Sequence, residues 1–405
     1  MKIAILTYHA PCNFGANLQA YSSMKFFQSC GYEVMVINYI TPPDEHPEYA
    51  DPSQAIAHWA FSQNALNVTK IVRTGKDIYD VVEKEKIDVI AIGADAVWNK
   101  RDKERLSVFF ADWLWNTDLA TSVKVIALSP AFMGQTYSDL SDDFKEKFKR
   151  GLLSFTSINA RDAWTMQRIN EDIIGSDYIR ILNPDPVFLL NEFVDIEWNH
   201  PSDIVSKGYI LVSLGKNSTL CSRKILAKLR RRWNNKLLTL AHQNGYKVVE
   251  IPLPEGISGF SFDYTVPYPI DPLQWFLWIK NAKGYFGLRF HAVVSAISSG
   301  TPFLSLDGYG KTPSWNKLLN LVGIHRFDSQ VNISSKIRNL LQGSGFENNR
   351  INASEISFIA PRFIIDKLLA FDTNKERVFK DSQVTLFKKN MNEALETCVE
   401  TNLKL

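Results

Sequence analysis

Short apolar segments alternate with helical segments along most of this sequence, and the alternation occurs in two series. The first series begins with KIAILTY at residues 2–8, and the second begins with GYILVSL at residues 208–214. Short apolar runs separated by amphipathic helices are typical of parallel strands that are buried on both faces. The sequence therefore predicts two α/β domains, each built on a parallel sheet.

A polar joint near residues 195–207 separates the two series. We expect an amino-terminal Rossmann-like domain at residues 1–195, a second Rossmann-like domain at 205–345, and a helical tail at 346–405 that packs back on the domains. A chain of 405 residues is longer than a single core usually serves, which agrees with this division. The predicted fold class is α/β, with the two Rossmann-like domains in a GT-B-like arrangement.

Composition is that of ordinary globular domains and argues against several other classes. Hydrophobic residues make up 45% and charged residues 22%, and the formal net charge is +3, so we expect neither bulk disorder nor a nucleic-acid partner. The four cysteines (Cys12, Cys30, Cys221 and Cys398) are scattered, which fits a reducing compartment better than disulfides or a zinc site. We find no signal peptide and no membrane-spanning run. The expected location is cytoplasmic, either free or at the inner face of the membrane.

Polar groups follow four strand-like segments of the first domain. They lie at residues 13–17, 93–99, 129–132 and 160–162. In open parallel sheets, ligands bind beyond the carboxyl ends of the strands. Each segment alone is equally well explained as a turn, and Asp162 suits a helix N-cap. Because all four would lie at one edge of one sheet, the functional reading is favoured.

The sharpest local pattern in the second domain is GLRFHA at residues 287–292, where a predicted strand ends and a helix begins. Arg289 offers a planar fork of donors that suits a phosphate or carboxylate, and His291 can exchange a proton near neutral pH. The helix amino terminus adds backbone donors. The alternatives are a histidine that caps the turn and an arginine paired with a nearby carboxylate. If Arg161 faces these residues across the interdomain cleft, the three side chains form a pocket for a small dianion.

A basic helix is predicted at residues 220–244. Its cations are Arg223, Lys224, Lys228, Arg230, Arg231 and Arg232. A solvated face explains this helix better than peripheral contact with a membrane or another polyanion, although the second reading stays open.

Five segments together resemble one family. NFGANLQAY at 13–21, GADAVWN at 93–99, SINARD at 157–162, the dipeptide Asp185-Pro186, and RFHA at 289–292 resemble, in this order, the signature segments of the polysaccharide pyruvyl transferases. The resemblance spans roughly residues 1–310. The sequence departs from the commoner family forms at SPA (129–131) and at Ala94, where serine is frequent.

The resemblance implies a GT-B-like fold and a reaction. That reaction moves the pyruvyl group of phosphoenolpyruvate onto two hydroxyls of a sugar, in a cell-surface polysaccharide or its lipid-linked precursor, and forms a pyruvate ketal. By similarity, Arg161, Arg289 and His291 hold phosphoenolpyruvate. His291 is the candidate acid and Asp95 the candidate base. Phosphoenolpyruvate is a substrate, and this scheme requires no metal or other cofactor.

The polar strand ends of the first domain are assigned to the acceptor side. The candidate acceptor-binding residues are Asn13, Gly15, Asn17, Asp95, Trp98 and Ser129. Two alternatives remain: a GT-B glycosyltransferase that uses a nucleotide sugar, and a non-catalytic glycan-binding module.

Overall fold

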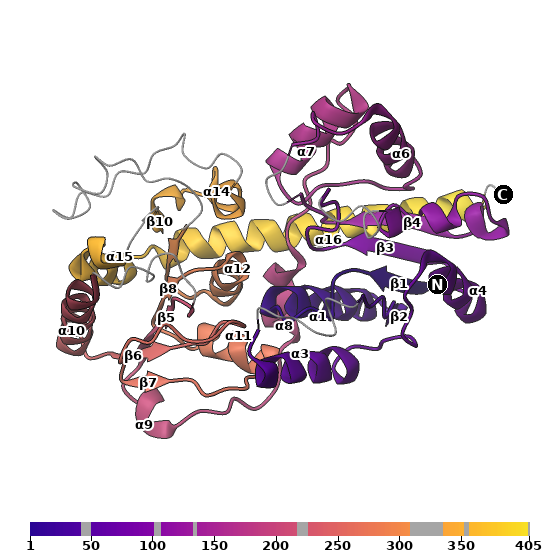
Figure 1. Cartoon of the computed structure of the whole chain (residues 1–405). Coiled ribbons are helices and arrows are strands. Elements are labelled where there is room, and N and C mark those ends of the chain that lie inside the picture. The colour runs from indigo at the N-terminus through magenta and orange to yellow at the C-terminus, as the bar shows by residue number, and fades with distance from the viewer. Residues whose placement is uncertain are drawn as a thin grey trace. The chain divides into compact units, whose positions relative to one another are not determined.

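The computed structural model divides the chain into two α/β units, each built on its own parallel sheet (Figure 1). The structure describes residues 1–41, 50–100, 107–132, 136–216, 226–307, 335–351 and 356–403. Unit 1 comprises Met1–Pro47, His58–Phe193 and Asp381–Leu405, and unit 2 comprises Glu48–Ala57 and Val194–Lys380.

The sheet of unit 1 has four parallel strands in the order β2-β1-β3-β4. Its strands are β1 (Lys2–Leu6), β2 (Glu33–Val36), β3 (Val89–Gly93) and β4 (Lys124–Leu128). Its helices are α1 (Phe14–Ser29), α4 (Gly75–Glu85), α6 (Asp142–Leu153), α7 (Ala163–Ile169) and α8 (Leu190–Phe193), and α3 (Pro52–Asn64) continues into it from unit 2. β3 and β4 are buried throughout, as the apolar runs VIAI in β3 and VIAL in β4 predict.

Residues 155–160 (FTSINA) resemble a strand in sequence but form no continuous strand. Isolated bridges, Ile126 to Ser157 and Ala160 to Leu182, stand in its place. The Asn159 side chain donates to the carbonyl oxygen of Ala127 (2.7 Å) and so takes a partner that a strand backbone would otherwise use.

Unit 2 carries six parallel strands in the order β10-β9-β8-β5-β6-β7. The strands are β5 (Tyr209–Ser213), β6 (Lys247–Glu250), β7 (Tyr264–Thr265), β8 (Gly284–Gly287), β9 (Phe303–Leu306) and β10 (Arg350–Ile351). The helices are α9 (Ser202–Val205), α10 (Ala227–Gln243), α11 (Pro272–Lys280), α12 (Phe290–Ser299), α14 (Lys336–Leu341) and α15 (Pro361–Leu369). Buried side chains from both layers form one core.

The chain ends and domain limits differ from the expected continuous blocks. Residues 48–57 belong to unit 2, where Gln54 exchanges two hydrogen bonds with the backbone of Ile270 (2.8 and 2.9 Å). The last helix, α16 (Thr373–Leu403), begins in unit 2 and ends in unit 1. Its unit 1 portion buries Phe387, Met391 and Cys398, which recur at helical spacing and make one apolar stripe.

Within the described part of the chain, no helix has the length and apolar character needed to cross a bilayer. The residues Arg223 and Lys224 of the expected basic helix, and Cys221, lie outside the described residues.

Candidate functional site

The strand order of unit 1 reverses between β1 and β3. The chain passes from β1 to β2 on one side and then returns to add β3 and β4 on the other. Open parallel sheets bind ligands at such a switch point, beyond the carboxyl ends of the strands. In unit 1 these ends lead into the amino terminus of α1 and into the Ala94-Asp95 turn.

Unit 2 has its own switch point, between β5 and β8. β6 and β7 extend the sheet on one side, and β9 and β10 extend it on the other. The carboxyl end of β8 leads directly through Leu288 and Arg289 into α12. The structure therefore places the RFHA segment at the position in unit 2 where the sheet topology favours a ligand.

Backbone strain marks the same strand ends. Of the described non-glycine residues with a positive φ angle, Lys86 and Ala111 lie elsewhere, whereas Ala94, Ser129 and Arg289 have φ angles of 77°, 49° and 91°. Such conformations cost about 1–3 kcal/mol each and persist only where the surrounding structure imposes them. Each of the three residues follows a strand of a central sheet, so the strain lies at the edges that hold the candidate residues.

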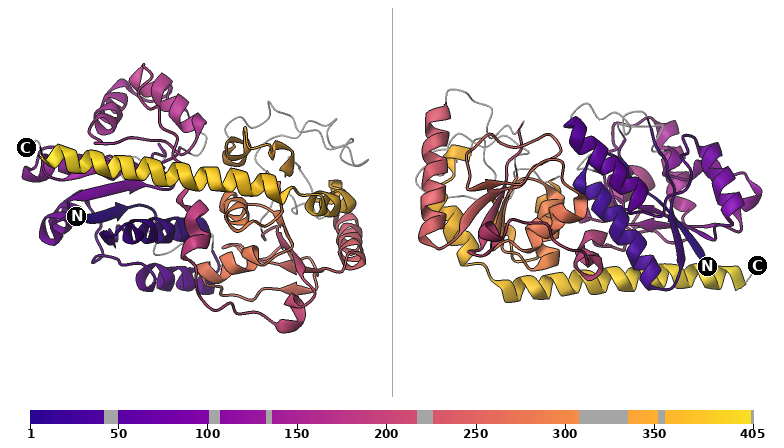
Figure 2. Two further views of the ribbon diagram at one scale, coloured as in Figure 1. Left: turned by 180° about the vertical axis from the view of Figure 1, so that it is seen from behind. Right: turned by 90° about the horizontal axis from the view of Figure 1, so that it is seen from below.

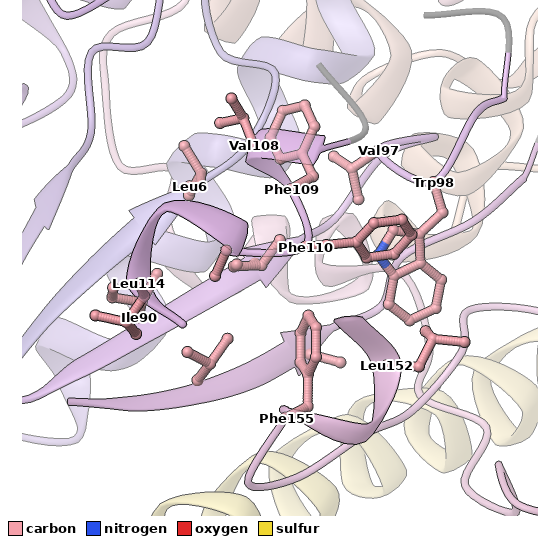
Figure 3. Packing of buried hydrophobic residues seen from close by; sticks show 14 of the residues in the cluster. Leu6, Ile90, Val97, Trp98, Val108, Phe109, Phe110, Leu114, Leu152 and Phe155 are labelled. Atoms are coloured by element: carbon pink, nitrogen blue, oxygen red, sulfur yellow. The ribbon is translucent and has the colours of Figure 1, made fainter. Parts of the chain in front are cut away.

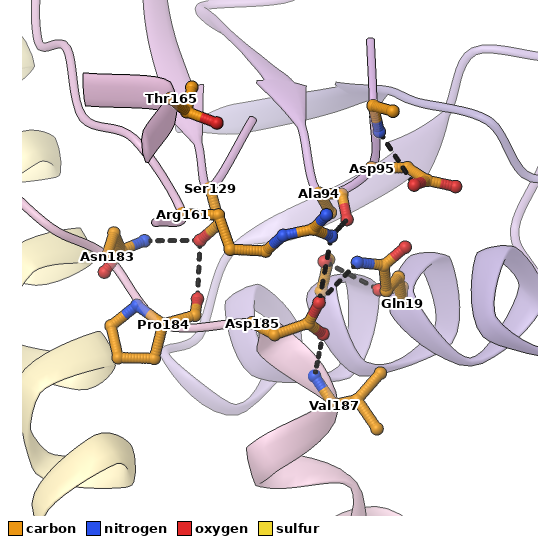
Figure 4. A network of polar contacts seen from close by, with 12 residues as sticks. Gln19, Ala94, Asp95, Ser129, Arg161, Thr165, Asn183, Pro184, Asp185 and Val187 are labelled. Carbon is orange, nitrogen blue, oxygen red and sulfur yellow. Dashed lines mark hydrogen bonds and ion pairs between the residues drawn. The ribbon is translucent and has the colours of Figure 1, made fainter. Parts of the chain in front are cut away.

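A buried ion pair holds the edge of unit 1 together (Figure 4). Arg161 Nη1 lies 3.1 Å from Asp185 Oδ2, and the two side chains are 3% and 1% exposed. The same carboxylate accepts from Gln19 Nε2 (2.7 Å) and from the backbone N–H of Val187 (3.0 Å). Arg161 Nη1 also donates to the carbonyl oxygen of Ala94 (3.4 Å). The pair thus connects α1, the turn after β3 and the segment after Pro184.

The Arg161 guanidinium is paired with a carboxylate of the protein itself, so it is not free to bind a ligand without breaking that pair. Removing one partner of a buried ion pair typically costs 3–5 kcal/mol, roughly, because the other charge is left uncompensated. A ligand would have to offset a cost of that order to draw Arg161 away from Asp185. Arg161 therefore acts as a positioning residue for the Ala94-Asp95 turn, and its direct contact with phosphoenolpyruvate stays a prediction.

Ser129 is also part of the internal support. Its hydroxyl donates to the carbonyl oxygen of Pro184 (2.6 Å) and accepts from Asn183 Nδ2 (2.8 Å), and its N–H donates to Asn159 Oδ1 (2.9 Å). The residue has no exposed surface. Its polar groups bind one protein segment to another, and none of them is presented to an acceptor.

Trp98 requires a correction. We expected its ring to contact the acceptor, but it is 0% exposed and packs with Phe110, Phe132 and Phe155 in the core (Figure 3). The turn after β3 folds back so that this side chain fills the aromatic cluster. A fully buried ring has no face for a sugar, so Trp98 supports the turn that carries Asp95.

Asp95 and Asn13 remain at the edge of unit 1. Asp95 is 9% exposed, and its Oδ1 accepts from the N–H of Ala96 (2.7 Å). Asn13 is exposed and caps α1, because its Oδ1 accepts from the N–H of Gly15 (2.9 Å). Gly15 itself is buried. Asp95 is therefore a nearly buried carboxylate at this edge, and its contact with an acceptor stays a prediction.

Asn17 lies in a buried chain of polar contacts. Its Nδ2 donates to the carbonyl oxygen of His9 (2.7 Å), and its Oδ1 contacts His58 Nδ1. Because an amide oxygen can only accept, His58 Nδ1 carries a proton and donates it to Asn17 Oδ1. Among the described residues, His58 Nε2 has no hydrogen-bond partner. Burial lowers the pKa of His58 to about 3.

The depressed pKa of His58 predicts an acid-sensitive unit 1. An unfolded histidine takes up its proton near pH 6.5, whereas folded His58 resists it until about pH 3. The stability that neutral His58 supports is complete above pH 6.5 and is lost as the pH falls, by about 1.4 kcal/mol per pH unit. Urea unfolding between pH 7 and pH 4 should show this slope in the free energy of unfolding. In His58→Gln the slope should be smaller by the contribution of one proton, about 1.4 kcal/mol per pH unit. An identical slope in both proteins would contradict the assignment.

Arg289 has a partner that a ligand could replace. Its Nη2 pairs with Glu255 Oε1, and the two side chains are 45% and 14% exposed. Ion pairs with this much solvent access contribute about 0–1 kcal/mol. Gly215, with φ +70°, permits the approach, because a Cβ there would lie 2.8 Å from Leu253 Cδ1 and 3.0 Å from Glu255 Oε1. An anionic ligand could therefore compete with Glu255 for the Arg289 guanidinium.

His291 is the second residue of α12 and is half-buried. Its ring packs edge-on against Phe290, with centroids 5.0 Å apart. Arg289 occupies the N-cap position, and its side chain makes no capping hydrogen bond. The first turn of α12 therefore combines a guanidinium, an imidazole and helix N–H groups, which suits binding of an anion together with proton transfer.

Sequence reasoning missed three partners: Glu255, Gln19 and His58. Gln19 and Asp185 both lie in segments that resemble the family, but the sequence pattern assigns neither of them a role. Gln19 and Asp185 are 166 positions apart, and Glu255 and Arg289 are 34 apart, so no local pattern links them. Within the described ranges, no group of three or more His, Cys, Asp or Glu residues is arranged to hold a metal ion.

Comparison with known proteins decides the family. The sequence matches the family described as polysaccharide pyruvyl transferase over residues 13–308. The chain belongs to the polysaccharide pyruvyl transferase family. This match confirms the predicted resemblance and makes the protein a transferase of polysaccharide biosynthesis. Nothing among the curated proteins matches the sequence.

Solved structures bear on the fold of this pyruvyl transferase family member. The UDP-GlcNAc 2-epimerase from Neisseria meningitidis, bound to UDP-GlcNAc, is 12% identical, and the alignment covers 100% of each chain with a TM-score of 0.53. The glycosyltransferase SnogD from Streptomyces nogalater is 10% identical, with 98% and 99% of the chains covered and a TM-score of 0.48. The first likeness and the two parallel sheets confirm the predicted α/β class, with two Rossmann-like domains of the GT-B type and a helical carboxy-terminal region.

Proposed function

We propose that this family member transfers the pyruvyl group of phosphoenolpyruvate to two hydroxyls of a sugar and forms a pyruvate ketal. The observation that carries the proposal is the first turn of α12, where Arg289 has an exchangeable carboxylate partner and His291 follows it. Phosphoenolpyruvate carries a carboxylate and a phosphate on a three-carbon frame. One of these anionic groups replaces Glu255 on Arg289, and the helix N–H groups receive it as well.

The chemistry requires proton transfer and charge stabilisation. One sugar hydroxyl adds to C2 of phosphoenolpyruvate while C3 receives a proton and becomes a methyl group. The C2–O bond to phosphate then breaks, and the second hydroxyl closes the ketal as its proton leaves. His291 supplies the proton to C3 or to the departing phosphate, and Arg289 balances the charge that builds on that phosphate. No electron donor or acceptor enters this balance.

On this proposal, unit 1 receives the acceptor sugar. Asp95 accepts a hydroxyl proton, and the Arg161-Asp185 pair holds its turn in place. The acceptor is a sugar of a cell-surface polysaccharide or of its lipid-linked precursor. The scheme needs no metal and no cofactor besides the donor substrate.

A ligand panel tests the proposal. Phosphoenolpyruvate at a hundredfold excess over its Kd should stabilise the protein by about 2.7 kcal/mol, visible as a rise in Tm, and candidate acceptors should then release inorganic phosphate. UDP- and ADP-sugars serve as controls. Stabilisation by a nucleotide sugar without any response to phosphoenolpyruvate would indicate a glycosyltransferase. A response to glycans alone would indicate a binding module.

A further inference from the structure

Helix α10 of unit 2 carries an unusual concentration of positive charge. Its 17 residues contain five lysines or arginines and no aspartate or glutamate. Trp233 and Leu237 pack into the core of unit 2, while Lys228, Arg231 and Arg232 are exposed on the opposite face. The spacing of these three cations is i, i+3 and i+4, so they form one stripe along the helix.

The stripe is electrostatically unfavourable for the helix that carries it. Like charges at i and i+4, as in Lys228 and Arg232, repel one another. Basic residues in the first turn also oppose the positive end of the helix dipole. The N-cap residue, Leu226, makes no side-chain capping bond, and the first turn contains no acidic residue. An anion outside the helix would relieve all of these unfavourable interactions at once.

The described part of unit 2 does not supply that anion. Lys228, Arg231 and Arg232 form no ion pair with any described residue. The neighbouring helix α15 packs beside α10 (Figures 1 and 2) and carries a further exposed cation, Arg362. We define Lys228, Arg231 and Arg232 as the basic face.

We infer that the basic face docks the protein on an anionic phospholipid surface. Leu229 lies three positions before Arg232, at the margin of the basic face, and is 42% exposed; an apolar side chain beside a basic helical face suits the boundary between headgroups and acyl chains. Trp233, the aromatic residue of α10, is buried, so this helix offers no ring for stacking on the bases of a nucleic acid. The inference concerns a surface separate from the α12 turn and holds whether or not phosphoenolpyruvate is the donor.

Vesicle sedimentation tests the inference. The full-length protein should bind vesicles of phosphatidylcholine with phosphatidylglycerol, should not bind pure phosphatidylcholine, and should dissociate as salt is raised. The variant with Lys228→Gln, Arg231→Gln and Arg232→Gln should bind about a hundredfold more weakly, since each cation near an anionic surface contributes roughly a fivefold factor. Glutamine is a good helix former, so the melting temperature should not fall.

A matched control removes three exposed cations elsewhere: Arg180→Gln, Lys207→Gln and Lys389→Gln. Both triple variants lower the net charge by the same amount, so only the basic-face variant should lose vesicle binding. Equal binding by the two variants, or no binding by the unaltered protein, overturns the inference. Preference for a DNA duplex over the anionic vesicles overturns it as well. The vesicles contain no sugar acceptor and no phosphoenolpyruvate, so failure of this assay is distinct from failure of the proposed reaction.

Discussion

Replacing Asp185 with asparagine is expected to lower the free energy of unfolding of unit 1 by about 3–5 kcal/mol. The substitution keeps the shape of the side chain but leaves the Arg161 guanidinium, 3% exposed, without its counter-charge. Asparagine also replaces one carboxylate oxygen by an NH2 group. That group cannot accept a hydrogen bond, whereas Gln19 and the Val187 N–H both donate to the Asp185 carboxylate. Calorimetry should show the transition of unit 1 shifted down by about 10 °C.

The same unit offers a matched control. Asp177 pairs with Arg180 at 3.6 Å, but these side chains are 78% and 75% exposed. Because water screens this pair, Asp177→Asn should cost less than about 1 kcal/mol. If the two asparagine variants had the same unit 1 melting temperature, burial of the Arg161-Asp185 pair would not be what stabilises the edge of unit 1.

Much of the fold follows from local physics that the sequence displays. β3 and β4 are runs of Val, Ile and Ala buried on both faces, and such runs have few alternatives. Asn13 before α1 is an N-cap of ordinary chemistry. The segment at 155–160 has the apolar pattern of a strand but forms only isolated bridges, and there the Asn159 side chain takes the partner of a backbone group. Because this hydrogen bond is made to the neighbouring strand β4, the periodicity of apolar residues within 155–160 cannot predict it.

The candidate site likewise has a part that the local sequence predicts and a part that depends on tertiary folding. The RFHA segment is local, so its place between β8 and α12 could be predicted from residues 287–292 alone. The partners of the two arginines could not, because Asp185 and Glu255 reach them only through tertiary folding. Trp98 shows a related limit. A pattern gives the position of a residue in a turn but not whether its side chain faces solvent or core, and this turn buries it.

The Arg289-Glu255 pair is far more exposed than the Arg161-Asp185 pair, which makes Arg289 the arginine more accessible to a ligand. Arg289→Ala should lower kcat/KM for phosphoenolpyruvate by about a hundredfold or more, because a hydrogen bond to a charged group contributes about 1.5–3 kcal/mol and a guanidinium can make two. It should also abolish the rise in Tm that phosphoenolpyruvate produces. Lys207→Ala, which removes an exposed cation elsewhere in unit 2, should leave both quantities unchanged.

Glu255→Gln tests the same site in the opposite direction. Glu255 is paired with Arg289 and places a negative charge where the proposed function puts the donor substrate. Glutamine removes that charge and the competition, so phosphoenolpyruvate should bind up to about fivefold more tightly, in line with the small contribution of an exposed ion pair. Weaker binding in Glu255→Gln would mean that Glu255 orients Arg289 for the ligand rather than competing with it. Unchanged binding in both Arg289→Ala and Glu255→Gln would place the donor elsewhere. Because the two substitutions should act with opposite sign on one equilibrium, a general loss of folding cannot reproduce the expected pair of results.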